Sequence, residues 1–126
     1  MKKLIAVLAI MFTIDAAAFV GTGNDNVDDA REFMRWLNGG TNLEHLHVAY
    51  WQGTVAGLSS VFSESSYKYS VCYPKGAKLS QIAVIAARYL IDHPEKWATD
   101  LNFLVWESHL KAFGLQDENC WSNIKE

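Results

Sequence analysis

The sequence contains few prolines and cysteines, and it has no cluster of positive charge. Among its 126 residues there are two prolines and two cysteines, and 11 lysines and arginines are set against 14 acidic residues. The net charge of −3 argues against nucleic acid as a partner, because binding to phosphates requires a basic surface. The length accommodates one domain.

Residue patterns typical of enzymes and metal sites are also missing. The zinc-binding pattern H-E-x-x-H is absent. His45 and His47 are two positions apart, so on a helix they point to different faces, and we expect one solvated and one half-buried ring. His93 falls in a predicted turn, and His109 lies beside an apolar stripe as a core-edge residue. We therefore expect no catalytic residue, no metal and no cofactor.

The longest apolar run lies at the N-terminus and is too short to cross a bilayer, which requires about 20 residues. Lys2 and Lys3 precede an uncharged stretch from Leu4 to Ile14, and Ala16 and Ala18 follow at the spacing of a signal-peptidase site. Residues 1–18 are therefore predicted to be a removable signal peptide, and 19–126 a single exported domain without a membrane span. A buried N-terminal core helix is the alternative.

Cys72 and Cys120 are the only cysteines. An even number of cysteines in an exported chain predicts a disulfide, since such chains reach an oxidising compartment. On the chain-entropy model, closing a loop of this length stabilises the fold by about 4 kcal/mol. Two buried free thiols are the alternative interpretation.

Apolar residues recur at helical spacing in four segments. Asp25 or Asn26 can cap the first helix, and Leu37 ends it before two glycines. Pro94 can begin the last helix, where its missing N–H is tolerated, and Gly114 closes it. We predict an all-α fold, a small four-helix bundle-like domain, with helices over about residues 26–37, 42–62, 79–92 and 94–114.

The second predicted helix contains an ambiguity. Val48 to Val55 can also form a short strand, because the apolar stripe is imperfect there. Gly53 and Gly57 are four residues apart and share one helix face, although glycine inside a helix costs up to about 1 kcal/mol. Their spacing indicates a close helix crossing or a bend.

Two segments lack helical periodicity. Residues 19–26 contain two glycines and no apolar period, which predicts a mobile lead-in to the first helix. Residues 63–78 contain serines, a proline and a glycine, and they form the longest predicted loop. Tyr67, Tyr69 and Tyr73 make this loop richer in aromatics than a solvated linker needs, and long loops in small domains are often functional.

Tryptophan is abundant for a chain of this length, and we expect about three of the five to pack in the core. Trp97 falls on the inner stripe of the last predicted helix, and Trp106 lies beside that stripe, close enough to its edge to reach the surface. Exposed tryptophan and tyrosine commonly anchor interfaces. The five are Trp36, Trp51, Trp97, Trp106 and Trp121.

An ordered set of motifs resembles the Rap/Tai family of type VI secretion amidase immunity proteins. The aromatic segment Tyr50–Gly57 resembles that family's aromatic-x-x-Gly element, and Val71–Gly76 is similar to its Cys-x-Pro-x-Gly element. The stretch from Gln81 through Tyr89-Leu90 to Pro94-Glu95, followed by Phe113 and Cys120, has the family's order.

The resemblance implies a small helical periplasmic protein with a disulfide, often a homodimer, which binds a peptidoglycan amidase effector and blocks its active-site groove. We expect the loop from Glu64 to Tyr73 to enter that groove, and its predicted contact residues are Glu64, Tyr67, Lys68, Tyr69 and Tyr73. The alternatives are a periplasmic stress chaperone or another small exported binding protein. An enzyme is the third hypothesis.

Overall fold

A computed structural model describes residues 20–41, 45–64, 69–117 and 120 of the chain. These residues form four α-helices and one short 3-10 helix, and within them there is no strand, only two isolated bridges. The predicted all-α class is confirmed. The proposed signal peptide lies outside the described residues. The helices are α3 (Gly23–Leu37), α4 (His45–Phe62), α5 (Leu79–Asp92), the 3-10 helix η1 (Pro94–Lys96) and α6 (Leu101–Phe113).

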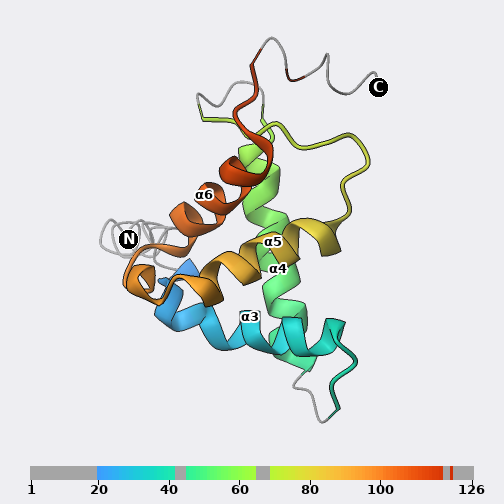
Figure 1. Ribbon diagram of the computed structural model, residues 1–126, viewed down its shortest axis with the longest axis vertical. Coiled ribbons are helices and arrows are strands. Elements are labelled where there is room, and N and C mark those ends of the chain that lie inside the picture. The colour runs from blue at the N-terminus through green and yellow to red at the C-terminus, as the bar shows by residue number, and fades with distance from the viewer. Residues whose placement is uncertain (1–19, 42–44, 65–68, 118–119, 121–126) are drawn as a thin grey trace, which may run out of the picture.

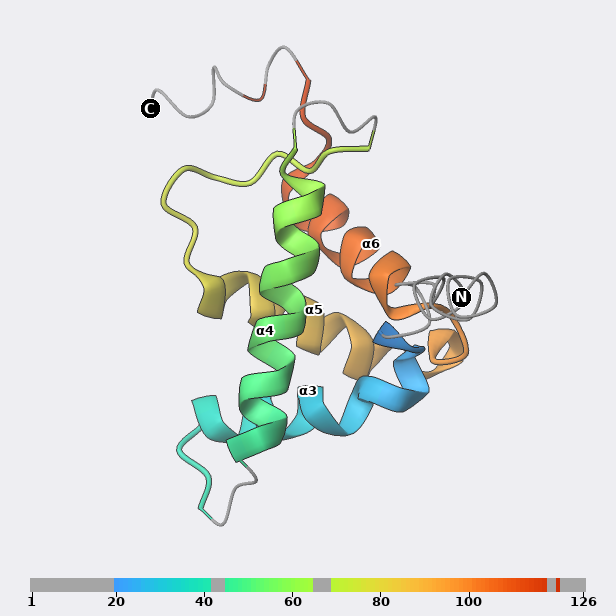
Figure 2. The same ribbon diagram turned by 180° about the vertical axis from the view of Figure 1, so that it is seen from behind.

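The four α-helices cross one another around α5, which lies in the middle of the fold (Figure 1). Helix α3 passes below α5 in this view, α6 lies above it, and α4 crosses behind it. Seen from the other side, α4 is nearest the viewer, and none of the other described helices lies in front of it (Figure 2). Helix α5 therefore has neighbours around most of its circumference, whereas α4 has them on one side.

Small side chains allow this close packing around α5. Ala83, Ala86 and Ala87 are buried with Ile82 and Leu90, at the spacing of one broad helix face. Because alanine adds little bulk, the neighbouring helices can approach the α5 backbone closely. The neighbouring helices contribute large side chains to the core, among them Phe33, Trp51 and Leu104.

Ring N–H groups from outside α5 donate to its backbone carbonyls. Trp51 Nε1 of α4 donates to the carbonyl of Ala83 at 3.1 Å, and His109 Nε2 of α6 lies 2.8 Å from the carbonyl of Ile82. Because a carbonyl can only accept, Nε2 of His109 carries the proton. Trp97 Nε1 donates to the carbonyl of Leu90 at 2.7 Å. Each of these three rings therefore has a polar partner for its N–H group.

The first helix begins earlier than the sequence predicts. Thr22 is its N-cap, and the Thr22 backbone N–H donates to Asp25 Oδ2 at 2.9 Å, so Asp25 lies within the first turn. Asn26 is buried and also does not cap the helix. Its side-chain amide donates to the carbonyls of Val20 and Thr22, at 2.7 and 2.8 Å.

The expectation of a mobile lead-in is wrong over residues 20–26, which are held against the connection before α6. The backbone N–H groups of Gly23 and Asn24 donate to the carbonyls of Thr99 and Trp97, at 3.0 and 2.8 Å. A Cβ on Gly23 would lie 2.9 Å from the Trp97 Cα, which is too close for a side chain. The glycine that suggested a loop is instead required by this contact.

The last predicted helix is divided. Pro94 starts only the single turn η1, and α6 starts at Leu101. Trp97 lies in the connection rather than on the inner face of α6, and it is half-buried. Its indole N–H donates to the carbonyl of Leu90 near the end of α5, and the chain is not α-helical between η1 and α6.

Residues Val48 to Val55 are helical, which resolves the strand ambiguity in favour of α4. Gly53 and Gly57 lie on its exposed side, and a Cβ at either position would meet nothing within 4 Å. Neither glycine therefore lies at a close crossing between the helices that the structure describes.

We expect replacement of Trp51 to show how strongly the fold depends on the core around α5. Trp51→Ala should lower the free energy of unfolding by about 3–5 kcal/mol, because it removes a buried ring and leaves a cavity. Trp36→Ala, at an exposed ring, is the control and should cost about 1 kcal/mol or less. Urea unfolding of both variants measures the difference, and equal losses would contradict the assignment of Trp51 to the core.

Candidate protein-binding surface

The loop after α4 is tied to the end of α6 by backbone hydrogen bonds and by the predicted disulfide. Cys72 and Cys120 are bonded, with their Cα atoms 5.8 Å apart, so the disulfide prediction is confirmed. The Cys72 backbone N–H donates to the carbonyl of Gly114 at 2.9 Å, and Gln116 N–H donates to the carbonyl of Ser70 at 2.8 Å. The described part of this loop, from residue 69 onward, is therefore fixed to the end of α6.

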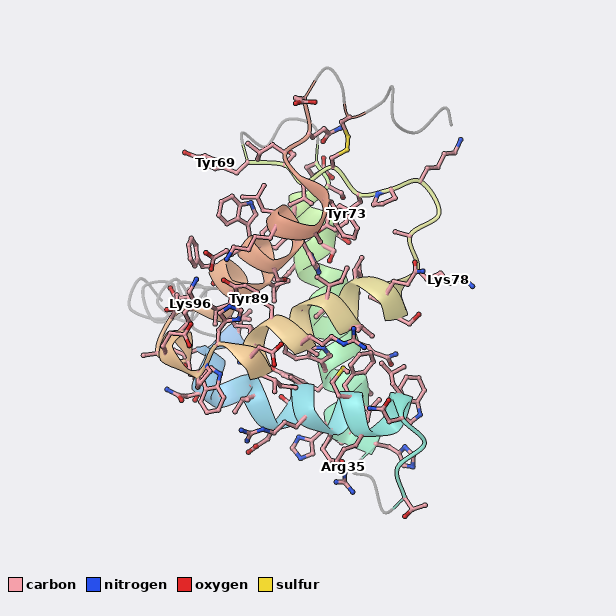
Figure 3. All side chains as sticks on the ribbon, viewed as in Figure 1. Arg35, Tyr69, Tyr73, Lys78, Tyr89 and Lys96 are labelled. Atoms are coloured by element: carbon pink, nitrogen blue, oxygen red, sulfur yellow. A yellow bond between two sulfur atoms is a disulfide. The ribbon has the colours of Figure 1, made fainter. Side chains whose placement is uncertain are left out.

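Three aromatic side chains form a cluster at this end, which we call the aromatic patch: Tyr69, Phe103 and Trp106. Trp106 lies in the middle, with ring centroids 6.0 Å from Tyr69 and 5.7 Å from Phe103. Its Nε1 donates to the Tyr69 carbonyl at 2.8 Å. Tyr69 and Phe103 remain 47% and 48% exposed, and Figure 3 shows Tyr69 projecting from the edge of the molecule. The patch is thus both exposed and held in place.

Charged side chains that are paired with one another adjoin the patch on α6. Glu107 lies four residues after Phe103 and accepts hydrogen bonds from Tyr89 Oη at 2.6 Å and from Lys96 Nζ at 3.0 Å. The bond from Tyr89, aided by Lys96, lowers the pKa of Glu107. Bonds to Tyr89 and Glu107 raise the pKa of Lys96. Tyr89 and Lys96 lie side by side in Figure 3.

Tyr73 is placed differently from Tyr69, although both belong to the same loop. Tyr73 is half-buried, and its hydroxyl donates to His109 Nδ1 at 2.7 Å. Its ring lies 5.6 Å from that of Phe113. Burial raises the pKa of Tyr73 to about 12, and a hydrogen bond with Ser59 opposes the shift. This tyrosine therefore joins the loop to the core.

The structure brings together only part of the predicted contact set. Glu64 is exposed just beyond the end of α4, and Tyr69 belongs to the aromatic patch. Tyr67 and Lys68 lie outside the described residues. Phe103 was not among the contact residues predicted from the sequence. Its position three residues before Trp106, outside the inner stripe of α6, would nevertheless place both rings on one outer face of the helix.

The histidines have the environments expected of structural residues. His45 is exposed and His47 is partly exposed, as expected, with His47 Nδ1 in contact with Asp29. His109 is completely buried, deeper than the expected core edge. His93 follows α5 and stacks on the ring of Tyr89, with centroids 4.1 Å apart.

A hollow of about 530 Å³ between α3 and α4 contains the Asp29–His47 contact. Among the described residues that line it, none is a serine, threonine, cysteine or lysine that could act as a nucleophile beside this pair. Within the described ranges no group of three acidic, histidine or cysteine side chains could hold a metal ion, and no helix is both long and apolar enough to span a bilayer.

Neither a protein family model, nor a curated protein, nor a solved structure matches this chain significantly. Its function must therefore be inferred from its own residues.

We expect the stability of the protein to decrease in mild acid because of His109. Burial lowers the pKa of His109, and the bond to Ile82 offsets this shift only in part. The unfolded chain therefore binds a proton at higher pH than the folded one. The stability that neutral His109 contributes is fully present above about pH 6.5 and is lost as the pH falls below this value. His109→Asn should flatten the dependence of unfolding free energy on pH between 7 and 5, whereas His45→Asn should leave it unchanged. An unaltered slope in the first variant would contradict the assignment.

Proposed function

We propose that this protein is exported to the periplasm and acts by binding another protein through the aromatic patch. The observation that carries the proposal is the exposed Tyr69–Trp106–Phe103 cluster at the end of the fold closed by the disulfide. Aromatic side chains dominate binding energy at interfaces, because they bury a large area with few rotatable bonds.

The rigidity of the patch supports this role. The Trp106 bond to the Tyr69 carbonyl and the Cys72–Cys120 disulfide hold the patch before any partner arrives. A surface ordered in advance loses less conformational entropy on binding than a flexible loop does. Glu64 and the acidic net charge suit a partner whose docking surface is basic.

We further propose that the partner is a peptidoglycan amidase effector of a type VI secretion system. This part rests on the resemblance of the ordered motifs between Tyr50 and Cys120 to the Rap/Tai immunity proteins. In this proposal the loop after α4 and the aromatic patch cover the active-site groove of the amidase, and the protein itself catalyses no reaction. The contact set is Glu64, Tyr67, Lys68, Tyr69 and Tyr73, extended by Phe103 and Trp106.

The decisive variant is Phe103→Asp, which places a charge on the patch at an exposed position. It should weaken binding to the amidase by at least about 30-fold, the equivalent of a 2 kcal/mol hot spot. Leu37→Asp, an equally drastic change of an exposed residue at the end of α3, should leave the affinity unchanged. Calorimetric titration of purified type VI amidase effectors measures both affinities, and co-expression measures protection of the cells.

Equal losses in the two variants would overturn the assignment of the patch. Failure of every tested amidase to bind would overturn the proposed partner class. If the protein then suppressed aggregation of an unfolded client at low pH, the alternative of a periplasmic stress chaperone would replace it.

A further inference from the structure

A groove lies between the second half of α4 and the connection that leads to α5. Figure 2 shows this connection bowing outward before it returns to α5. The groove is a depression of about 340 Å³, and its walls combine apolar side chains with serine hydroxyls. The walls include Ala56, Ser60, Ser63, Pro74, Ala77 and Leu79. We call this depression the α4–α5 groove.

A smaller depression, which we call the disulfide hollow, continues the groove toward the disulfide. It measures about 100 Å³, and both Cys72 and Cys120 line it. Ser63 and Tyr73 line the hollow and the groove alike, so the two adjoin. Residues 121–126 follow Cys120 directly and lie outside the described residues. We call them the C-terminal segment, and the disulfide fixes its starting point at one end of the groove.

The disulfide hollow is also lined by a residue whose polar side chain needs a donor. Gln116 Oε1 is buried, and it accepts no hydrogen bond from the described residues. Such acceptors are rare in folded proteins, because burying one without a partner costs free energy. The C-terminal segment can supply the donor from its backbone N–H groups or from the side chains of Trp121 and Asn123.

The C-terminal segment is long enough to follow the groove. An extended chain spans about 3.3 Å per residue, so residues 121–126 can reach about 20 Å from Cys120. Along α4 the groove extends from Ser63 back to Ala56, which is about 10 Å at the helical rise of 1.5 Å per residue. Trp121 and Ile124 provide apolar side chains that suit the apolar walls.

Attachment at Cys120 favours this segment over a separate molecule. A short tether holds a binding segment at a local concentration on the order of millimolar, and a separate chain would have to match that concentration in solution to compete. The N-terminal segment joins the described fold at Val20, and Val20 is not among the described residues that line the groove. Of these candidates, the C-terminal segment is therefore the one that begins at the groove itself.

We propose that residues 121–126 fold back over the disulfide and occupy the α4–α5 groove, with Trp121 over the disulfide hollow and Ile124 beside Ala56. A donor from the segment pairs with Gln116 Oε1. The segment thereby shields the disulfide from reductants. This inference goes beyond the proposed function and is independent of it, because none of the aromatic-patch residues lines the groove. Failure of the protein to bind an amidase therefore leaves it untouched, and the reverse also holds.

A pair of introduced cysteines tests where the segment lies in the full chain. Ala56→Cys combined with Ile124→Cys should form a second intramolecular disulfide on mild oxidation, because both positions would lie in the groove. Thr54→Cys combined with Ile124→Cys is the matched control. Thr54 lies two residues earlier in α4 on a different face, so this pair should not crosslink. Non-reducing peptide mapping by mass spectrometry identifies the bonded pairs and verifies that Cys72 and Cys120 remain joined.

A second measurement tests the shielding of the disulfide. Trp121→Ser combined with Ile124→Ser keeps the length of the segment and removes its apolar contacts. Reduction of the disulfide by dithiothreitol should become at least about threefold faster, since the attacking thiolate needs access to a sulfur atom. Ser122→Ala combined with Lys125→Ser changes the same segment but retains both apolar side chains, and it should leave the rate unchanged. Circular dichroism verifies that both variants remain helical.

Several results would overturn the proposal. Equal crosslinking of Ile124→Cys with Ala56→Cys and with Thr54→Cys would mean that the segment does not lie in the groove. Crosslinks between two chains would assign the groove to a second copy. An Ala56→Cys thiol that forms no crosslink and resists alkylation would assign it to another part of the same chain, and one that is freely alkylated would leave the groove open. An unchanged reduction rate in the double serine variant would contradict the shielding.

Discussion

The packing of three neighbours onto the alanine face of α5 is the constraint on which the rest of the structure depends. Ala83, Ala86 and Ala87 leave the α5 backbone accessible, and the rings of Trp51, His109 and Trp97 reach its carbonyls. Each ring both fills volume and satisfies a polar group, and in a small domain few other contacts can do so. The positions of α4, η1 and α6 all follow from these contacts.

The same interactions connect the core to the surface proposed for binding. His109 donates a hydrogen bond to the carbonyl of Ile82 in α5 and accepts one from Tyr73. Tyr73 lies in the loop that leads to α5. One residue earlier, Cys72 is bonded to Cys120, and three residues before that Tyr69 meets Trp106. The aromatic patch thus rests on a continuous series of contacts that begins in the core. Acid that protonates His109 would weaken this series at its buried end.

The aromatic patch combines exposed rings with paired charges nearby, a composition that suits a binding partner of different sequence. Binding through this patch would explain why a chain with so few candidates for chemistry exposes large apolar side chains at this end.

The sequence by itself indicated the helical class, the extent of α5 and a disulfide between the two cysteines, because each depends on local periodicity or on there being two cysteines. It left a strand possible over Val48 to Val55, which only the structure showed to be part of α4. It could not place the start of α3, since Gly23 is explained only by the Trp97 backbone that approaches it from far along the chain. Only the tertiary structure separated Tyr69 from Tyr73 and revealed Phe103 in the patch. The physical reason is that burial and exposure depend on which segments pack together, and local spacing does not specify them.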